Sequence, residues 1–348
     1  MKPHPVFLPL SWLYAFGVGV RNWLFDVGVL SIERVPCAVV SVGNVAAGGS
    51  GKTPFVIGLA SRFKELGHKV AILSRGYGRT SKGYLLVSDG SGPRVQPEEA
   101  GDEATEIASK LRGVIVAVDE QRVRGAKRLI QDHGVDVIVL DDGFQHRYLH
   151  RDLDLVLVPA DGVMPKHLLP AGMLREPLSS LRRADLLVVT RCTRAAEAEQ
   201  IRKQLRFQKP VIGVKREATA IVVLQTGERQ SLSAIHGKKV LLLSGIASPD
   251  SFEATVNACG VRIVDRLQFP DHHWFGTADI KKTHNRFRSS GVEFILTTAK
   301  DAVRMKRNPD QWSSLPIMIV ESESKILIGG EILDNMLERA IQKGKAWR

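Results

Sequence analysis

Short apolar runs rich in Val and Ile recur along the chain and alternate with stretches that have helical spacing. Continuous apolar runs of this length are typical of strands buried on both faces, as in a parallel sheet covered by helices. The pattern predicts helices at residues 53–66 and 122–133. The predicted strands lie at residues 37–42, 69–73, 114–118, 135–140, 153–158 and 186–190. The sequence therefore predicts an α/β fold, with helices on both faces of a parallel sheet in a first domain at residues 35–214.

A second set of apolar runs begins near Val211 and predicts a smaller α/β lobe at residues 238–348. Its strands are expected at residues 240–243, 294–297 and 317–320. Residues 215–237 are interpreted as a short β linker, because residues 220–224 alternate and Thr226-Gly227 favours a turn. We expect a cleft between the two lobes, with ligands at the carboxyl ends of the strands.

The first 34 residues are predicted to form a helical segment that contacts a membrane. Residues 6–30 are apolar, but Arg21 and Asp26 interrupt them, whereas a spanning helix needs about 20 uninterrupted apolar residues. Pro9 is expected to break an early helix. The segment's aromatic residues are Trp12, Tyr14, Trp23 and Phe25. Amphipathic rings favour a helix lying in the headgroup region, and the alternative is a helix packed on the protein's own core.

The charge of the chain indicates anionic partners. Its 348 residues carry a formal net charge of +12, which suits nucleic acid, acidic phospholipid or a phosphorylated substrate. No zinc-finger spacing or RNA-binding aromatic motif accompanies the charge, and the arginines are dispersed, so we expect no nucleic-acid partner. The three cysteines, Cys37, Cys192 and Cys259, lie far apart in the sequence and support neither a disulfide framework nor a metal knuckle. This cysteine usage favours a reducing, cytoplasmic compartment.

A glycine-rich loop, GNVAAGGSGKTP at residues 43–54, joins the first predicted strand to the first predicted helix. Glycines let backbone N–H groups converge on phosphate oxygens, and the helix N-terminus adds positive potential. The residues expected to hold a nucleotide are Gly48, Gly49, Ser50, Gly51, Lys52 and Thr53. Lys52 can reach the β- and γ-phosphates, and the Thr53 hydroxyl can ligate Mg²⁺. Ala46 stands where the general phosphate-loop pattern has its first glycine, and a purely structural glycine loop is the alternative.

An apolar strand that ends in two carboxylates, VDVIVLDDGFQHR at residues 135–147, resembles the strand that organises Mg²⁺ in phosphate-loop enzymes. One of Asp141 and Asp142 is expected to hold the metal. Acidic pairs at strand ends also form simple turns. The glycine-rich loop upstream favours the metal site.

Seven motifs in order give the chain a resemblance to a known family. They are VGNVAAGGSGKTP, SRGYGR, GDEA, DDGFQHR, LLPAGMLREP, FPDHH and TTAKDAVR. Together they closely resemble the tetraacyldisaccharide 4'-kinase family, also called lipid A 4'-kinase, from about residue 7 to residue 305. The family's loop resembles GNxxxGGxGKTP, so Ala46 fits it, whereas Ala104 stands where the family often has Pro.

This resemblance implies an ATP-dependent kinase in lipid A biosynthesis. The γ-phosphate of ATP would be transferred to the 4'-hydroxyl of a tetraacylated glucosamine disaccharide 1-phosphate, which gives lipid IVA. The partners implied are this lipid A precursor and the surface of the bacterial inner membrane, at its cytoplasmic face. ATP and Mg²⁺ are the cofactors implied, and residues 35–214 become the kinase domain.

The resemblance also assigns catalytic candidates. A sugar hydroxyl is a poor nucleophile, so a base must accept its proton. Asp102 resembles the family's catalytic carboxylate, and His272 would pair with it from the second lobe; capping or turn formation is the alternative for both. Lys52, Mg²⁺ and Arg175 would neutralise charge on the transferring group, with Glu176 as a supporting carboxylate. An ordinary surface ion pair is the alternative for Arg175.

Two further motifs have open roles. The loop at residues 74–79 is interpreted as a lid, in which Arg75 and Arg79 meet a phosphate. For Lys300 and Asp301 two roles stay open: they contact the nucleotide, or they form a salt bridge at the start of a helix. Three rival functions stay open on the residues alone: a membrane-associated switch ATPase, a nucleic-acid-dependent ATPase and a small-molecule ligase.

Overall fold

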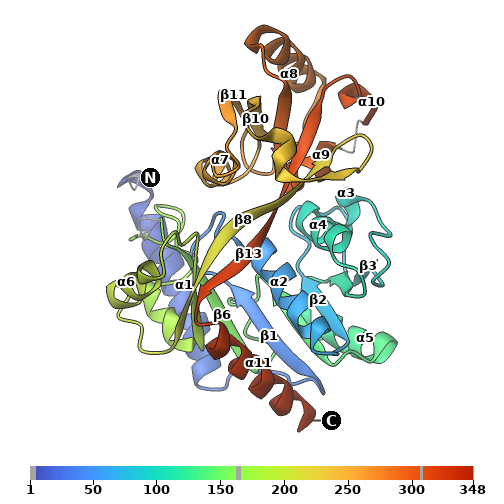
Figure 1. Ribbon diagram of the computed structural model, residues 1–348. Coiled ribbons are helices and arrows are strands. Elements are labelled where there is room, and N and C mark those ends of the chain that lie inside the picture. The colour runs from blue at the N-terminus through green and yellow to red at the C-terminus, as the bar shows by residue number, and fades with distance from the viewer. Residues whose placement is uncertain (1–4, 162–165, 306–308, 348) are drawn as a thin grey trace. The chain divides into compact units, whose positions relative to one another are not determined.

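The chain divides into two compact units. The computed structural model describes residues 5–161, 166–305 and 309–347 (Figure 1). The first unit comprises residues 1–215 and 325–348, and the second comprises residues 216–324. Two long strands, β8 (Val211–Val223) and β13 (Ile317–Ile328), run from one unit into the other. The last 24 residues therefore pack with the first unit, whereas the sequence suggested that they belong to the second lobe.

The sheet of the first unit is parallel except at one edge. Its strand order is β3-β4-β2-β5-β1-β6-β7-β8, and only β3 of these strands runs antiparallel to its neighbour. The strands are β1 (Ala38–Gly43), β2 (Val70–Ser74), β3 (Leu85–Ser88), β4 (Ile115–Val118), β5 (Val137–Asp141), β6 (Leu153–Pro159) and β7 (Leu186–Thr190). The central strand β1 pairs with β5 and β6, so the glycine-rich loop leaves the middle of the sheet.

Helices cover both faces of this sheet, as predicted. Successive residues of a strand point to opposite faces, and Val39 and Val40 accordingly pack into two different cores. One core is covered by α2 (Lys52–Glu65), α4 (Asp102–Lys110) and α11 (Gly330–Lys345). The opposite face is covered by α5 (Arg122–His133) and α6 (Ala196–Gln204). The C-terminal helix α11 comes so close to β1 that a Cβ at Gly344 would lie 2.3 Å from the Ala38 nitrogen.

The second unit has its own parallel strands, in the order β11-β10-β12-β13. Its elements are β9 (Arg229–Gln230), β10 (Lys239–Ser244), α7 (Pro249–Asn257), β11 (Arg262–Gln268), α8 (Thr277–Ser290), β12 (Phe294–Thr298), α9 (Ala299–Met305) and α10 (Pro309–Trp312). Leu241 packs in a core with Ile280 of α8, and Leu242 packs with Phe252 of α7 on the other face. The short strand β9 pairs antiparallel with β8 beyond a turn at residues 224–226.

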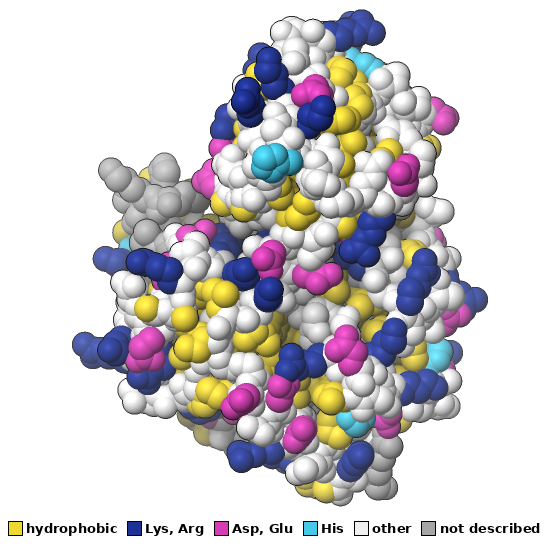
Figure 2. All heavy atoms as spheres, viewed as in Figure 1, with side chains coloured by type: hydrophobic (Ala, Val, Ile, Leu, Met, Phe, Trp, Pro, Cys, Tyr) yellow, Lys and Arg dark blue, Asp and Glu magenta, His cyan; other side chains and the backbone are white. Residues whose placement is uncertain are grey.

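The N-terminal segment forms one helix, α1 (Leu8–Asp26). Pro9 lies in its first turn, where the missing N–H is not needed, so the expected break at Pro9 is wrong. Trp12 and Phe16 are 70% and 71% exposed, whereas Ser11 and Phe25 are buried. Among the described residues, no helix has the length and apolar character to cross a membrane. On the face shown in Figure 2, Lys and Arg side chains are spread over the surface and interspersed with Asp and Glu.

Candidate active site

The glycine-rich loop ends at the start of α2, with the backbone geometry that a phosphate site requires. Gly51 precedes the helix with φ +80° and Gly48 has φ +111°, which is a region that favours glycine. Lys52 and Thr53 are the first two residues of α2. The N–H groups of a first helical turn have no partner within the helix and can bind an anion. The Asn44 side chain braces the loop by donating to Ser50 Oγ at 3.1 Å.

Asp142 joins two of the predicted cations. Lys52 Nζ lies 3.3 Å from Asp142 Oδ1, and Arg175 Nη1 donates to Asp142 Oδ2 at 2.6 Å. Burial alone would raise the pKa of Asp142, but Lys52 and Arg175 outweigh it and hold that pKa below its usual value. Asp142 adopts φ +53°, so the chain turns sharply directly after β5. The structure thus brings together three residues that the sequence predicted on separate motifs.

Asp141 has a different environment from its neighbour. It ends β5, is buried, and accepts a hydrogen bond from Ser74 Oγ at 3.0 Å. Burial, with the negative charges of Glu103 and Asp142, raises the pKa of Asp141 to about 7. With a pKa of about 7 this carboxyl group is partly protonated at neutral pH, and a cation beside it would favour its charged form.

The loop that carries Arg175 is fixed to the glycine-rich loop. Ala46 and Leu174 form an antiparallel bridge, with Arg175 N donating to Val45 O at 2.8 Å. Next to Arg175, Glu176 is 1% exposed and accepts a hydrogen bond from Arg183 at 2.7 Å. Arg175 therefore lies in this polar centre, where its side chain and that of Asp142 are 29% and 31% exposed.

Asp102 and His272 occupy different compact units. Asp102 is the first residue of α4, is 5% exposed, and accepts a hydrogen bond from Glu103 N at 2.9 Å. In the second unit, His272 has φ +60°, and its Nε2 lies 3.2 Å from Lys300 Nζ. Asp271 lies beside both, 3.8 Å from His272 and 3.7 Å from Lys300.

The two motifs with open roles have distinct contacts. Arg79 forms an ion pair with Glu120 and donates to Gly83 O at 2.7 Å, so its guanidinium braces the loop after β2. Arg75, in contrast, is exposed and contributes positive potential at Arg122. In the second unit, Asp301 pairs with Arg304 inside the core, which fits the salt-bridged alternative for this motif.

Sequence reasoning missed a group of basic side chains near Asp142. Arg122 is buried, donates to Asp119 O at 2.9 Å, and has its pKa lowered by burial to about 10. Burial, together with Arg122 and Arg21, lowers the pKa of His146 to about 4, so its imidazole is neutral at pH 7. His146 follows Asp142 in the same motif, and this position was its only signal in the sequence.

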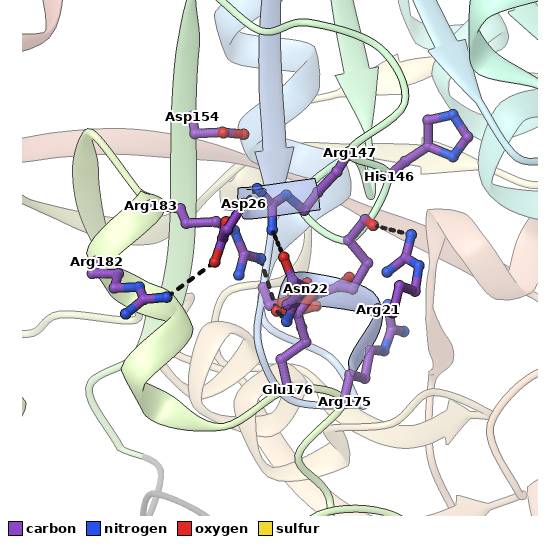
Figure 3. A network of polar contacts seen from close by, with 12 residues as sticks. Arg21, Asn22, Asp26, His146, Arg147, Asp154, Arg175, Glu176, Arg182 and Arg183 are labelled. Carbon is purple, nitrogen blue, oxygen red and sulfur yellow. Dashed lines mark hydrogen bonds and ion pairs between the residues drawn. The ribbon is translucent and has the colours of Figure 1, made fainter. Parts of the chain in front are cut away.

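The N-terminal helix belongs to the same polar network (Figure 3). Arg147 donates to Asn22 O at 3.0 Å and pairs with Asp26 at 2.8 Å. Arg21 donates to Gln145 O at 2.9 Å. The polar residues that interrupt the apolar N-terminal segment therefore bind it to the rest of the first unit.

Known proteins match the chain over almost its full length. The family described as tetraacyldisaccharide-1-P 4'-kinase, LpxK, matches residues 3–342. The tetraacyldisaccharide 4'-kinase of Anaeromyxobacter dehalogenans is 37% identical over 327 residues, which are 92% of this chain and 86% of the relative. That of Syntrophus aciditrophicus is 36% identical over 329 residues, with 91% and 87% covered. The crystal structure of LpxK from Aquifex aeolicus in complex with ATP superposes with a TM-score of 0.77 at 34% identity, covering 97% of this chain and 98% of that one.

Proposed function

The chain belongs to the tetraacyldisaccharide-1-P 4'-kinase family, and from this premise we propose which of its residues carry out the phosphoryl transfer. The enzyme phosphorylates the 4'-hydroxyl of tetraacyldisaccharide 1-phosphate with ATP, a step of lipid A biosynthesis. Membership decides among the rival functions, because the switch ATPase, the nucleic-acid-dependent ATPase and the small-molecule ligase do not act on this lipid. The observation that supports the assignment of residues most directly is the cluster of Lys52, Asp142 and Arg175 beside the glycine-rich loop.

ATP is proposed to bind with its phosphates on the loop from Gly48 to Thr53. The left-handed Gly48 and Gly51 leave the backbone N–H groups open to approach by phosphate oxygens. Lys52 would exchange its contact with Asp142 for the β- and γ-phosphates. The loop's rigid bracing by Asn44 would keep this geometry fixed without nucleotide.

Thr53, Asp141 and Asp142 are the residues proposed to hold Mg²⁺. A hydroxyl and two carboxylates are the oxygen donors that this hard cation prefers. The raised pKa of Asp141 supports the assignment, because a cation bound beside this buried carboxyl group would favour its charged form. Bound there, Mg²⁺ would neutralise charge on the phosphates.

Asp102 is proposed as the base that accepts the proton of the 4'-hydroxyl, and His272 as its partner. Asp102 is held at the N-terminus of α4 and is largely removed from solvent, which limits the orientations of its carboxylate. Lys300 contacts Nε2 of His272, which leaves that nitrogen as an acceptor and places the imidazole proton on Nδ1. Arg175 is proposed to stabilise negative charge on the transferring group.

The exposed face of α1 is proposed to contact the cytoplasmic surface of the bacterial inner membrane. Trp12, Leu13 and Phe16 are each about two-thirds or more exposed and lie on one side of the helix, opposite the buried Phe25. Aromatic and aliphatic side chains of this kind enter the headgroup region, where the acylated substrate resides. The net charge of +12 would add attraction to an anionic lipid surface.

The decisive experiment measures transfer of ³²P from labelled ATP to tetraacyldisaccharide 1-phosphate in detergent micelles. Asp102→Asn and Lys52→Met should each lower kcat by about 10²–10⁴. Lys127→Met, which removes an exposed lysine on α5, should retain the wild-type rate. A rate within threefold of wild type in Asp102→Asn would exclude this residue as the base.

A further inference from the structure

The polar face of α1 contacts the loop that carries Arg175 at three points. Ser11 Oγ donates to Leu168 O at 2.8 Å, and Tyr14 Oη donates to Arg175 O at 3.0 Å. Asn22 Nδ2 donates to Glu176 Oε2 at 3.2 Å. Positions 11, 14 and 22 share one side of a helix, opposite the exposed Phe16. One side of α1 thus faces solvent, while the other supports both ends of residues 168–176.

The same helix also holds the turn that follows Asp142. Arg21 donates to Gln145 O at 2.9 Å, and Asn22 O accepts a hydrogen bond from Arg147 at 3.0 Å (Figure 3). Residues 145–147 directly follow the turn that contains Asp142. The helix therefore binds the segments on both sides of the Asp142–Arg175 ion pair, although these segments lie some thirty residues apart in the sequence.

The part of the contact between α1 and the Arg175 loop that involves a charged side chain is buried. Glu176 is 1% exposed, and its Oε2 accepts from both Asn22 and Arg183. Removal of one donor would leave the buried Glu176 carboxylate with fewer hydrogen bonds. Because an underpaired buried charge costs more free energy than a lost exposed contact, the loop that carries it would shift more readily. A displacement of about 1 Å at a group that stabilises a transition state costs up to about 10²-fold in rate.

We propose that Tyr14 and Asn22 are positioning residues for the phosphoryl transfer, and that α1 sets the place of Arg175 relative to Asp142. This rests on the role proposed for Arg175. Neither Tyr14 nor Asn22 touches the reacting atoms; both act through the segment Arg175–Glu176. The helix then has two separate tasks, with its apolar side turned to the membrane and its polar side to the active site.

A double-mutant cycle tests the proposal in the full-length enzyme, with ATP and tetraacyldisaccharide 1-phosphate in micelles. Tyr14→Phe removes one hydroxyl, and we expect kcat to fall about three- to tenfold with the KM for ATP unchanged. In an Arg175→Ala background the same change should alter kcat less than twofold, because its effect passes through Arg175. Asn22→Leu should show the same dependence on Arg175.

Tyr84→Phe is the matched control, because it removes a buried hydroxyl that has no hydrogen-bond partner among the described residues. It should leave kcat unchanged, and the melting temperatures of Tyr14→Phe and Tyr84→Phe should lie close to that of wild type. Independent, multiplicative effects of Tyr14→Phe and Arg175→Ala would overturn the proposal and leave the role of Arg175 intact. A wild-type kcat in Arg175→Ala would instead remove the role of Arg175, and the proposal with it.

Discussion

Arg175 Nη1 donates a hydrogen bond to Asp142 Oδ2 at 2.6 Å, and this contact joins two residues that lie 33 positions apart in the chain. Lys52 binds the second oxygen of the same carboxylate at 3.3 Å. Two cations and one carboxylate thus meet beside the phosphate loop, leaving a positive excess where an anionic phosphate is proposed to bind.

Asp142→Asn removes the negative charge of this side chain and keeps its size, so it tests the role of the charge. The amide cannot balance Lys52 and Arg175, nor hold a divalent cation as well as a carboxylate does. We expect kcat to fall about 10²- to 10³-fold in the ³²P transfer assay. Asp132→Asn, the same change at a surface ion pair of α5, should stay within twofold of wild type. A small fall in kcat for Asp142→Asn would indicate that Asp141 binds the divalent cation without Asp142.

His146 should give the first unit a stability that depends on pH. Burial lowers its pKa from 6.5 to about 4, so the unfolded chain binds a proton before the folded one as pH falls. Stability from the neutral imidazole is complete above about pH 7 and is lost between about pH 6.5 and pH 4. Between pH 7 and pH 5, the free energy of unfolding should fall by about 1–2 kcal/mol more in wild type than in His146→Gln.

Guanidinium denaturation at the two pH values measures this difference. His236→Gln, at an exposed position of the second unit, should keep the pH dependence of wild type. Equal pH dependence in wild type and His146→Gln would contradict burial of a neutral imidazole at this position.

The exposed face of α1 should determine binding to lipid vesicles. The double variant Trp12→Glu/Phe16→Glu replaces two exposed rings with charges that an anionic headgroup layer repels. Since a fully buried apolar side chain contributes about 1.5–3 kcal/mol, we expect partition to vesicles of anionic phospholipid to fall more than about 100-fold in a flotation assay. Leu66→Glu, an exposed leucine after α2, should leave partition unchanged, and the dissociation constant for ATP should be the same in all three proteins. Undiminished flotation of the double variant would place the membrane contact elsewhere.

Local signals in the sequence predicted the sheet and the phosphate loop, because both depend on neighbouring residues. The strand at residues 186–190 coincides with β7, and the loop after β1 leads into α2 as its glycines indicated. The edge strand β3 was missed because its four residues are only half-buried at one end and lack a long apolar run. In β13, the apolar run at residues 317–320 continues into the polar alternation ESESK, so eight further residues of strand were not predicted.

The ion pairs of the site required tertiary structure. Lys52, Asp142 and Arg175 each carried a signal in their own motif, but their contact depends on the bridge between Ala46 and Leu174. The pKa of His146 depends on how deeply its ring is buried, which periodicity does not determine. The roles of Asp102 and His272 stay predictions, and the transfer assay tests that of Asp102.

The second unit contains a buried ion pair whose removal should be costly. Asp301 and Arg304 are both inaccessible to solvent and lie 2.7 Å apart. Asp301 also accepts from Gly245 N at 2.9 Å, and Arg304 donates to His273 O at 3.2 Å, so the pair fixes the loops beside His272. Asp301→Ala leaves the Arg304 charge without its carboxylate and should destabilise the unit by about 3–5 kcal/mol.

Scanning calorimetry on three variants separates the cost of an unpaired buried charge from loss of the pair itself. Asp301→Leu/Arg304→Met removes both charges and should cost less than Asp301→Ala alone, because no charge then lies unpaired in the core. Glu293→Gln breaks the exposed pair with Lys238, which also lies at 2.7 Å, and should cost less than about 1 kcal/mol. The two ion pairs have the same N–O distance, so burial is the reason to expect different losses of stability. Equal losses in Asp301→Ala and Glu293→Gln would therefore mean that water reaches the Asp301–Arg304 pair.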